Sequence, residues 1–121
     1  MEPYVLGEME QRFAELIWQN EPVGSGALVR LAAQAFGWKK STTYTMLKRL
    51  CERGLFANEN GTVRALVSRE DYRVKQGEQL LAEGFGGSLP RFLAAFTRRN
   101  KLSDEEIEAL RRLIEAHEEK E

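Results

Sequence analysis

Apolar residues recur at helical spacing in three consecutive segments at the start of the chain. In residues 7–20 they follow the i, i+4, i+7, i+8 pattern of one helix face, at Met9, Phe13, Leu16 and Ile17. After a turn, Ser25 predicts the cap of a second helix, whose inward positions are Leu28, Leu31, Ala32 and Ala35. Gly37 stands where a left-handed residue ends a helix, and a third helix is predicted from Ser41 to Gly54.

The periodicity changes from helical to alternating after Gly54. Two short extended runs flank Asn60-Gly61, a pair that tolerates positive φ and favours tight hairpins. The second run alternates apolar and outward positions from Val63 to Ser68, as a half-buried strand does. Three helices followed by a hairpin is the winged helix-turn-helix arrangement, in which the third helix reads DNA and the hairpin flanks it.

Three further helices are predicted after the hairpin. Ser68, Ser88 and Ser103 stand at their starts, the last in a full capping box with Glu106. Together with Tyr72, these helices carry an apolar set that is too small for an independent core, so a second copy of the chain is the natural partner. The predicted dimer interface consists of Leu89, Phe92, Leu93, Phe96, Ile107, Leu110, Leu113 and Ile114. The alternative is that these helices fold back on the N-terminal domain.

The third predicted helix has an apolar face and a polar, cationic face. Its inward positions are Thr43, Met46, Leu47, Leu50 and Cys51. Hydroxyls bind phosphates or base edges, Lys and Arg add affinity through counterion release, and Arg can bind guanine with two hydrogen bonds. The predicted DNA-binding residues are Lys40, Ser41, Thr42, Tyr44, Thr45, Lys48 and Arg49, with Arg64 on the hairpin. A solvated helix face, and a cross-strand charge pair for Arg64, are the alternatives.

The charge distribution agrees with a nucleic-acid surface in the middle of the 121-residue chain. Residues 36–75 hold nine basic and four acidic side chains, a net of +5, whereas the segments before and after each carry −3. Ordinary scatter of surface charge is the alternative. The single cysteine fits a reducing compartment, and no apolar run approaches the ~20 residues of a membrane span, so we expect a cytoplasmic protein.

The same residues carry a resemblance to a known family. Residues 37–55, GWKKSTTYTMLKRLCERGL, followed by the hairpin, SREDY, FGGSL and KLSDEEIEALRRLIE, resemble the penicillinase repressor family (BlaI/MecI type). The resemblance runs from about Leu6 to Glu115. The family's pattern STV-x-T-L-L-x-R-L is matched at Ser41, Thr42, Thr45, Leu47, Arg49 and Leu50.

The resemblance implies a homodimeric winged-helix repressor. Such repressors bind inverted-repeat operators with TACA/TGTA-like half-sites and block β-lactam-resistance genes or other operons. In the best-known members a membrane metallopeptidase sensor leads to cleavage between an Asn and a Phe in the dimerisation region. The corresponding pair here is Ala95-Phe96, which keeps the Phe and lacks the Asn.

The sequence therefore predicts a mainly α fold with a small β-hairpin wing. Residues 1–68 form the predicted winged-helix DNA-binding domain, and residues 69–121 the predicted helical dimerisation domain. We find no set of catalytic residues and expect no enzyme, no metal site and no cofactor. The remaining alternative to a repressor is a winged-helix protein-interaction module without specific DNA binding.

Overall fold

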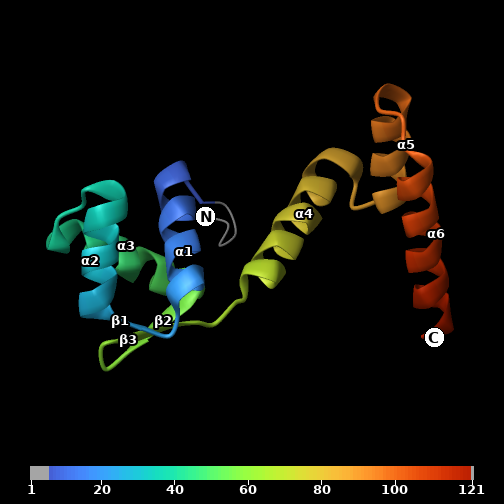
Figure 1. Cartoon of the computed structure of the whole chain (residues 1–121). Coiled ribbons are helices and arrows are strands. Elements are labelled where there is room, and N and C mark those ends of the chain that lie inside the picture. The colour runs from blue at the N-terminus through green and yellow to red at the C-terminus, as the bar shows by residue number, and fades with distance from the viewer. Residues whose placement is uncertain (1–5, 121) are drawn as a thin grey trace. The chain divides into compact units, whose positions relative to one another are not determined.

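The computed structural model describes residues 6–120, which form six helices and three strands (Figure 1). The helices are α1 (Glu8–Asn20), α2 (Ser25–Phe36), α3 (Lys40–Glu52), α4 (Arg69–Phe85), α5 (Leu89–Arg99) and α6 (Asp104–Glu119). The strands are β1 (Val23–Gly24), β2 (Phe56–Glu59) and β3 (Thr62–Ala65). The predicted fold class, a mainly α winged helix-turn-helix followed by further helices, is confirmed.

The chain divides into two compact units between Glu78 and Gln79, so α4 begins in the first unit and ends in the second. The predicted functional boundary between residues 68 and 69 falls at the start of α4. Whether DNA binding and dimerisation separate at that point stays a prediction.

The first unit is built around the contacts of α1, α2 and α3 with a small antiparallel sheet. The sheet order is β1-β3-β2, with Glu59 opposite Thr62 in the hairpin. Asn60 and Gly61 have φ angles of 53° and 87°, so the predicted Asn-Gly turn is confirmed. The fully buried core consists of Phe13, Ala14, Ile17, Leu28, Ala32, Leu47, Leu50, Leu55, Phe56, Val63 and Tyr72.

Three sequence predictions about this unit were wrong in detail. Met9 and Ala35 were expected to face inward, but both are exposed. Tyr72 was grouped with the apolar residues of the last three helices, yet it is fully buried in the core of the first unit. Its ring packs 5.2 Å from that of Trp18, a contact between residues far apart in the chain.

The predicted cap at Ser25 was also wrong. The N-cap of α2 is Gly24, which makes no side-chain capping bond, and Ser25 is the first helical residue. The physical reason is the strand β1, which the turn-like sequence did not predict. Val23 and Gly24 pair with Val63 and Thr62 of β3, so the extended backbone continues to the first residue of the helix.

The second unit contains the end of α4 together with α5 and α6. The predicted caps are confirmed: Ser88 Oγ accepts from the amide of Arg91, and Ser103 and Glu106 form the reciprocal capping box of α6. The Phe85 and Phe92 rings meet edge-on at 5.2 Å. No residue of α5 or α6 is fully buried in the single chain, so their apolar faces remain accessible.

Candidate nucleic-acid interface

The orientation of α3 is set by its buried face. Thr43, Leu47 and Leu50 are at most 2% exposed, because they pack into the core of the first unit. Met46 and Cys51 are half-buried at its edge, so the predicted inward face is confirmed. The opposite side is solvent-exposed and carries every α3 residue predicted to bind DNA, namely Lys40, Ser41, Thr42, Tyr44, Thr45, Lys48 and Arg49.

Two of the hydroxyl groups on α3 bond back to the helix. Oγ1 of Thr43 donates to the carbonyl of Lys39 at 3.2 Å, and Oγ1 of Thr45 donates to the carbonyl of Ser41 at 2.9 Å. Thr43 is buried, and this bond satisfies its hydroxyl, the only polar group of its side chain. Thr45 is exposed and its hydroxyl oxygen keeps its acceptor lone pairs, so it can still accept a hydrogen bond from a group outside the helix.

The cations of the basic middle segment fall into two groups. Five are paired with carboxylates: Arg53 with Glu10, Arg64 with Glu59, Arg69 and Arg73 with Glu15, and Lys75 with Glu78. The other four are Lys39, Lys40, Lys48 and Arg49, and within residues 6–120 none of them lies at ion-pair distance from an acid. Within residues 36–75 the unpaired positive charge therefore lies on α3 and on its N-cap residue Lys39. Elsewhere in the first unit, Arg12 and Arg30 are also exposed and not at ion-pair distance from an acid among residues 6–120.

The hairpin residue Arg64 stands apart from the α3 set. It lies on β3, is exposed, and pairs through Nε with the carboxylate of Glu59 on the neighbouring strand. This is the cross-strand pair that the sequence left as an alternative. Because both side chains are more than half exposed, the pair is screened by solvent and contributes little to stability. A phosphate could therefore compete for this guanidinium at small cost.

A small surface pocket lies where α3 meets β2 in the first unit. It has a volume of about 280 Å³ and is lined by Tyr44, Leu47, Lys48, Cys51 and Asn58. Burial raises the pKa of the Cys51 thiol, while a hydrogen bond from the backbone N–H of Asn58 acts in the opposite direction. The thiol is thus protonated near neutral pH and serves as a small packing group between helix and wing.

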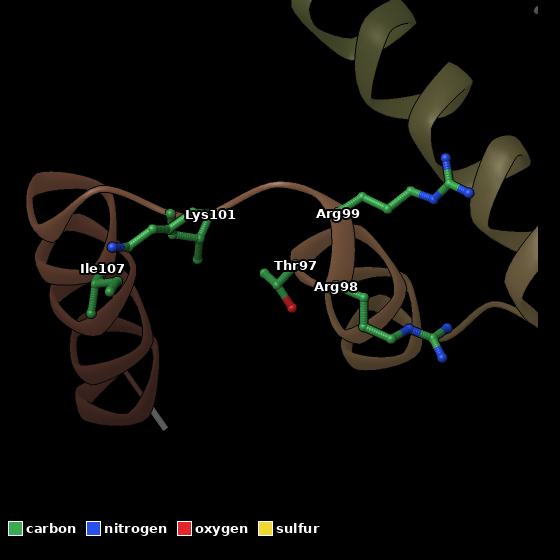
Figure 2. Close-up of a pocket in the computed structure, with 6 residues that line it drawn as sticks. Thr97, Arg98, Arg99, Lys101 and Ile107 are labelled. Carbon is green, nitrogen blue, oxygen red and sulfur yellow. The ribbon is translucent and has the colours of Figure 1, made fainter.

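The predicted dimer residues lie on α5 and α6 of the second unit. Leu89, Phe96, Leu113 and Ile114 are exposed by 41–67%, and the other four, Phe92, Leu93, Ile107 and Leu110, are half-buried. A 490 Å³ pocket lies at the α5–α6 connection (Figure 2). In this pocket Lys101 extends toward Ile107, whereas the side chains of Arg98 and Arg99 point away from Ile107. The three positive charges therefore do not converge on one point.

Comparison with known proteins identifies the family. The family model described as "Penicillinase repressor" matches residues 6–116. The chain belongs to the penicillinase repressor family. It is 24% identical to the penicillinase repressor of Bacillus licheniformis over 116 residues, which cover 93% of this chain and 91% of that protein.

Two further relatives carry the name methicillin resistance regulatory protein MecI. The protein from Staphylococcus aureus strain Mu50 is 21% identical and that from Mammaliicoccus sciuri is 20% identical. Each match covers 92% of this chain and 94% of the relative. The similarity therefore spans both units, and the resemblance seen in the sequence is confirmed.

Membership of the penicillinase repressor family supports a DNA-binding transcriptional repressor, a class of proteins that are generally not enzymes. Among residues 6–120, no three His, Cys, Asp or Glu side chains are grouped so that they could hold a metal ion. Within the same residues, no helix has the length and apolarity that crossing a bilayer requires. The unpaired cation Lys39 was not among the predicted DNA-binding residues, although its position directly before the third helix can be seen in the sequence.

Proposed function

We propose that this protein is a dimeric repressor that reads an inverted-repeat operator through α3 and the β2–β3 wing. The observation that carries the proposal is the distribution of charge within residues 36–75, the basic middle segment of the chain. Five basic residues of the middle segment are neutralised by carboxylates, and the four that are not stand on α3 or at its N-cap. A surface that keeps its cations unpaired gains counterion-release affinity for a polyanion at no cost in broken ion pairs.

The side chains of α3 fit distinct tasks in a DNA major groove. Arg49 has the planar guanidinium that binds guanine through two hydrogen bonds, and Thr45 can accept from a base amino group. Lys39, Lys40 and Lys48 are suited to phosphates, which fix the position of the protein but carry no sequence information. Arg64 would contact a phosphate beside the site read by α3, once DNA replaces Glu59 as the partner of its guanidinium.

The second unit supports the dimeric part of the proposal. Its apolar side chains, among them Leu113 at 67% exposure and Ile114 at 57%, remain uncovered in the single chain. A second copy would bury them, and a two-fold dimer would present two α3 helices to the two halves of an inverted repeat. We therefore propose residues 69–121 as the dimerisation domain and residues 1–68 as the DNA-binding domain.

The regulated genes are proposed by analogy with the relatives, whose names refer to penicillinase and to methicillin resistance. We propose β-lactam-resistance or related genes as targets and TACA/TGTA-like half-sites as the sequence that is read, in the cytoplasm. Release by cleavage through a membrane metallopeptidase sensor would have to act on the pair Ala95-Phe96, which lacks the Asn that precedes the Phe in the family.

The proposal is tested by titrating a labelled palindromic TACA/TGTA duplex and a scrambled duplex of equal composition at about 50 and 200 mM salt. We expect tight, salt-sensitive binding that prefers the palindrome, with two chains per duplex. Equal and weak binding to both duplexes, with little dependence on salt, would favour a winged-helix protein-interaction module instead.

A further inference from the structure

Ser25 connects the two elements of the proposed DNA-binding surface, the helix α3 and the β2–β3 wing. It is the first residue of α2, and its Oγ accepts a hydrogen bond of 3.1 Å from the hydroxyl of Tyr44 on α3. Its backbone N–H donates at 2.7 Å to the carbonyl of Gly61 at the tip of the wing. One residue thus contacts both the third helix and the hairpin turn that flanks it.

Backbone contacts hold Ser25 against the wing. Gly24, directly before it, pairs with Thr62 of β3, so the start of α2 is bound to the wing by the sheet as well as by the Gly61 carbonyl. A Cβ added at Gly61 would lie 3.9 Å from the Ser25 Oγ, which shows how close the wing tip comes to this side chain. The backbone of Ser25 is therefore held in place relative to the wing, and its hydroxyl is limited to the few positions that the χ1 rotamers allow.

The hydrogen bond to Ser25 restricts the orientation of Tyr44. Its side chain is 36% exposed on the outward side of α3, where a tyrosine without a partner would sample several rotamers. The bond to Ser25 holds the phenol ring on the side of α3 that faces α2. Binding DNA would then not have to immobilise the ring, and the entropy cost of ordering an interface side chain would be smaller.

We propose that Ser25 is a positioning residue of the DNA-binding surface, which acts by holding the Tyr44 ring in register with the wing. It does not need to touch DNA itself. The inference rests on the proposed function, since it assigns a role to Ser25 only through a DNA-contacting Tyr44.

The test is a double-mutant cycle measured as affinity for the palindromic and the scrambled duplex. Ser25→Ala and Tyr44→Phe each remove one side of the bond, and each should weaken binding to the palindrome by about two- to tenfold, the range for one hydrogen bond. The double variant should lose no more than either single one, because both changes delete the same interaction. Ser25→Thr, which keeps a hydroxyl, should restore most of the affinity.

Unfolding in urea separates positioning from stability. The bond is solvent-exposed, so all four variants should unfold within about 0.5 kcal/mol of the wild type. Losses that add in the double variant, or a Ser25→Ala variant that binds like the wild type, would overturn the positioning role while leaving the repressor function intact. A wild type that binds neither duplex in a salt-sensitive way would reject both.

Discussion

The hydroxyl of Tyr72, at the start of α4, donates a hydrogen bond of 2.7 Å to Oε1 of Gln11 on α1. The same hydroxyl accepts from Nε2 of Gln76 one turn later, and the ring is fully buried beside Trp18. Trp18 in turn donates through Nε1 to the carbonyl of Val67. The first part of α4 is therefore anchored in the core of the first unit, so that a helix leading to the second unit starts from a fixed point.

Replacing Tyr72 by Phe should lower the free energy of unfolding by about 1 kcal/mol, because Gln11 loses the donor of a partly buried hydrogen bond. The measurement is urea unfolding followed by circular dichroism. Tyr44→Phe is the matched control, because it removes an exposed hydroxyl and should change stability by less than about 0.5 kcal/mol. Equal stability of the two variants would mean that the Tyr72 network does not anchor α4.

Stability at alkaline pH should depend on Tyr72. Burial raises the pKa of its hydroxyl, the negative charges of Glu10 and Glu15 raise it further, and the positive charge of Arg53 opposes them. A raised folded-state pKa means that the contribution of Tyr72 is complete below the unfolded-state value of about 10 and is lost as the pH rises through and above it. The free energy of unfolding should thus fall more steeply between about pH 9 and 11 in the wild type than in Tyr72→Phe; parallel curves would contradict this.

Arg49→Ala should lower affinity for the operator by about 1–3 kcal/mol and reduce discrimination against the scrambled duplex, if the guanidinium binds a base. The guanidinium donates to the sulfur of Met46, 3.7 Å away, and forms no ion pair within residues 6–120, so removing it leaves no buried charge unpaired. Thr45→Ala should act in the same direction. The readout is the ratio of the two dissociation constants, and a ratio unchanged in both variants would remove α3 from the base-reading role.

Lys48→Ala should weaken binding to both duplexes to a similar extent. A lysine that neutralises one phosphate contributes about one unit to the slope of log affinity against log salt, so this slope should become shallower by about one. The control is Lys75→Ala, because Lys75 is on α4 and pairs with Glu78. A slope that changes equally in both variants would indicate a general charge effect and not a contact made by α3.

Leu113→Asp should turn dimers into monomers and lower operator affinity, because each half-site alone is bound weakly. Leu113 is 67% exposed in the single chain, so the substitution should change the stability of the monomer little and should matter only where a partner covers this side chain. Leu66→Asp is the matched control, since Leu66 is 58% exposed in the first unit and is not part of the predicted interface. Sedimentation velocity reports the mass, and a Leu113→Asp variant that remains dimeric would place the interface elsewhere.

The elements with strong local signals were predicted from the sequence. The Asn60-Gly61 turn, the capping box at Ser103 and the two faces of α3 follow from residues close together in the chain, and the structure confirms them. Sequence alone did not predict the strand β1, whose two residues pair only because β3 offers a free edge. It also misplaced Tyr72, whose burial depends on Trp18 and Gln11, more than fifty residues away.

The sequence predicted which face of α3 carries the candidate site, but not which of the basic residues are paired with acids. Helical spacing places Lys48 and Arg49 outward, but it cannot tell which cations are already neutralised by acids from other segments. Arg53 illustrates the difference, because it pairs with Glu10 of α1 across the fold. The roles of the individual DNA-binding and dimer residues stay predictions until binding is measured.

The most direct test of a dimer that reads an inverted repeat is the dependence of affinity on the spacing of the two half-sites. Two α3 helices held by one dimer reach half-sites only on the same face of the duplex, so inserting about five base pairs, half a helical turn, should reduce affinity sharply. An insertion of a full helical turn keeps both half-sites on the same face and changes only their separation, so it should reduce affinity less than the insertion of half a turn. Affinity that is the same at every spacing would contradict the account, because it would mean that each chain binds DNA alone.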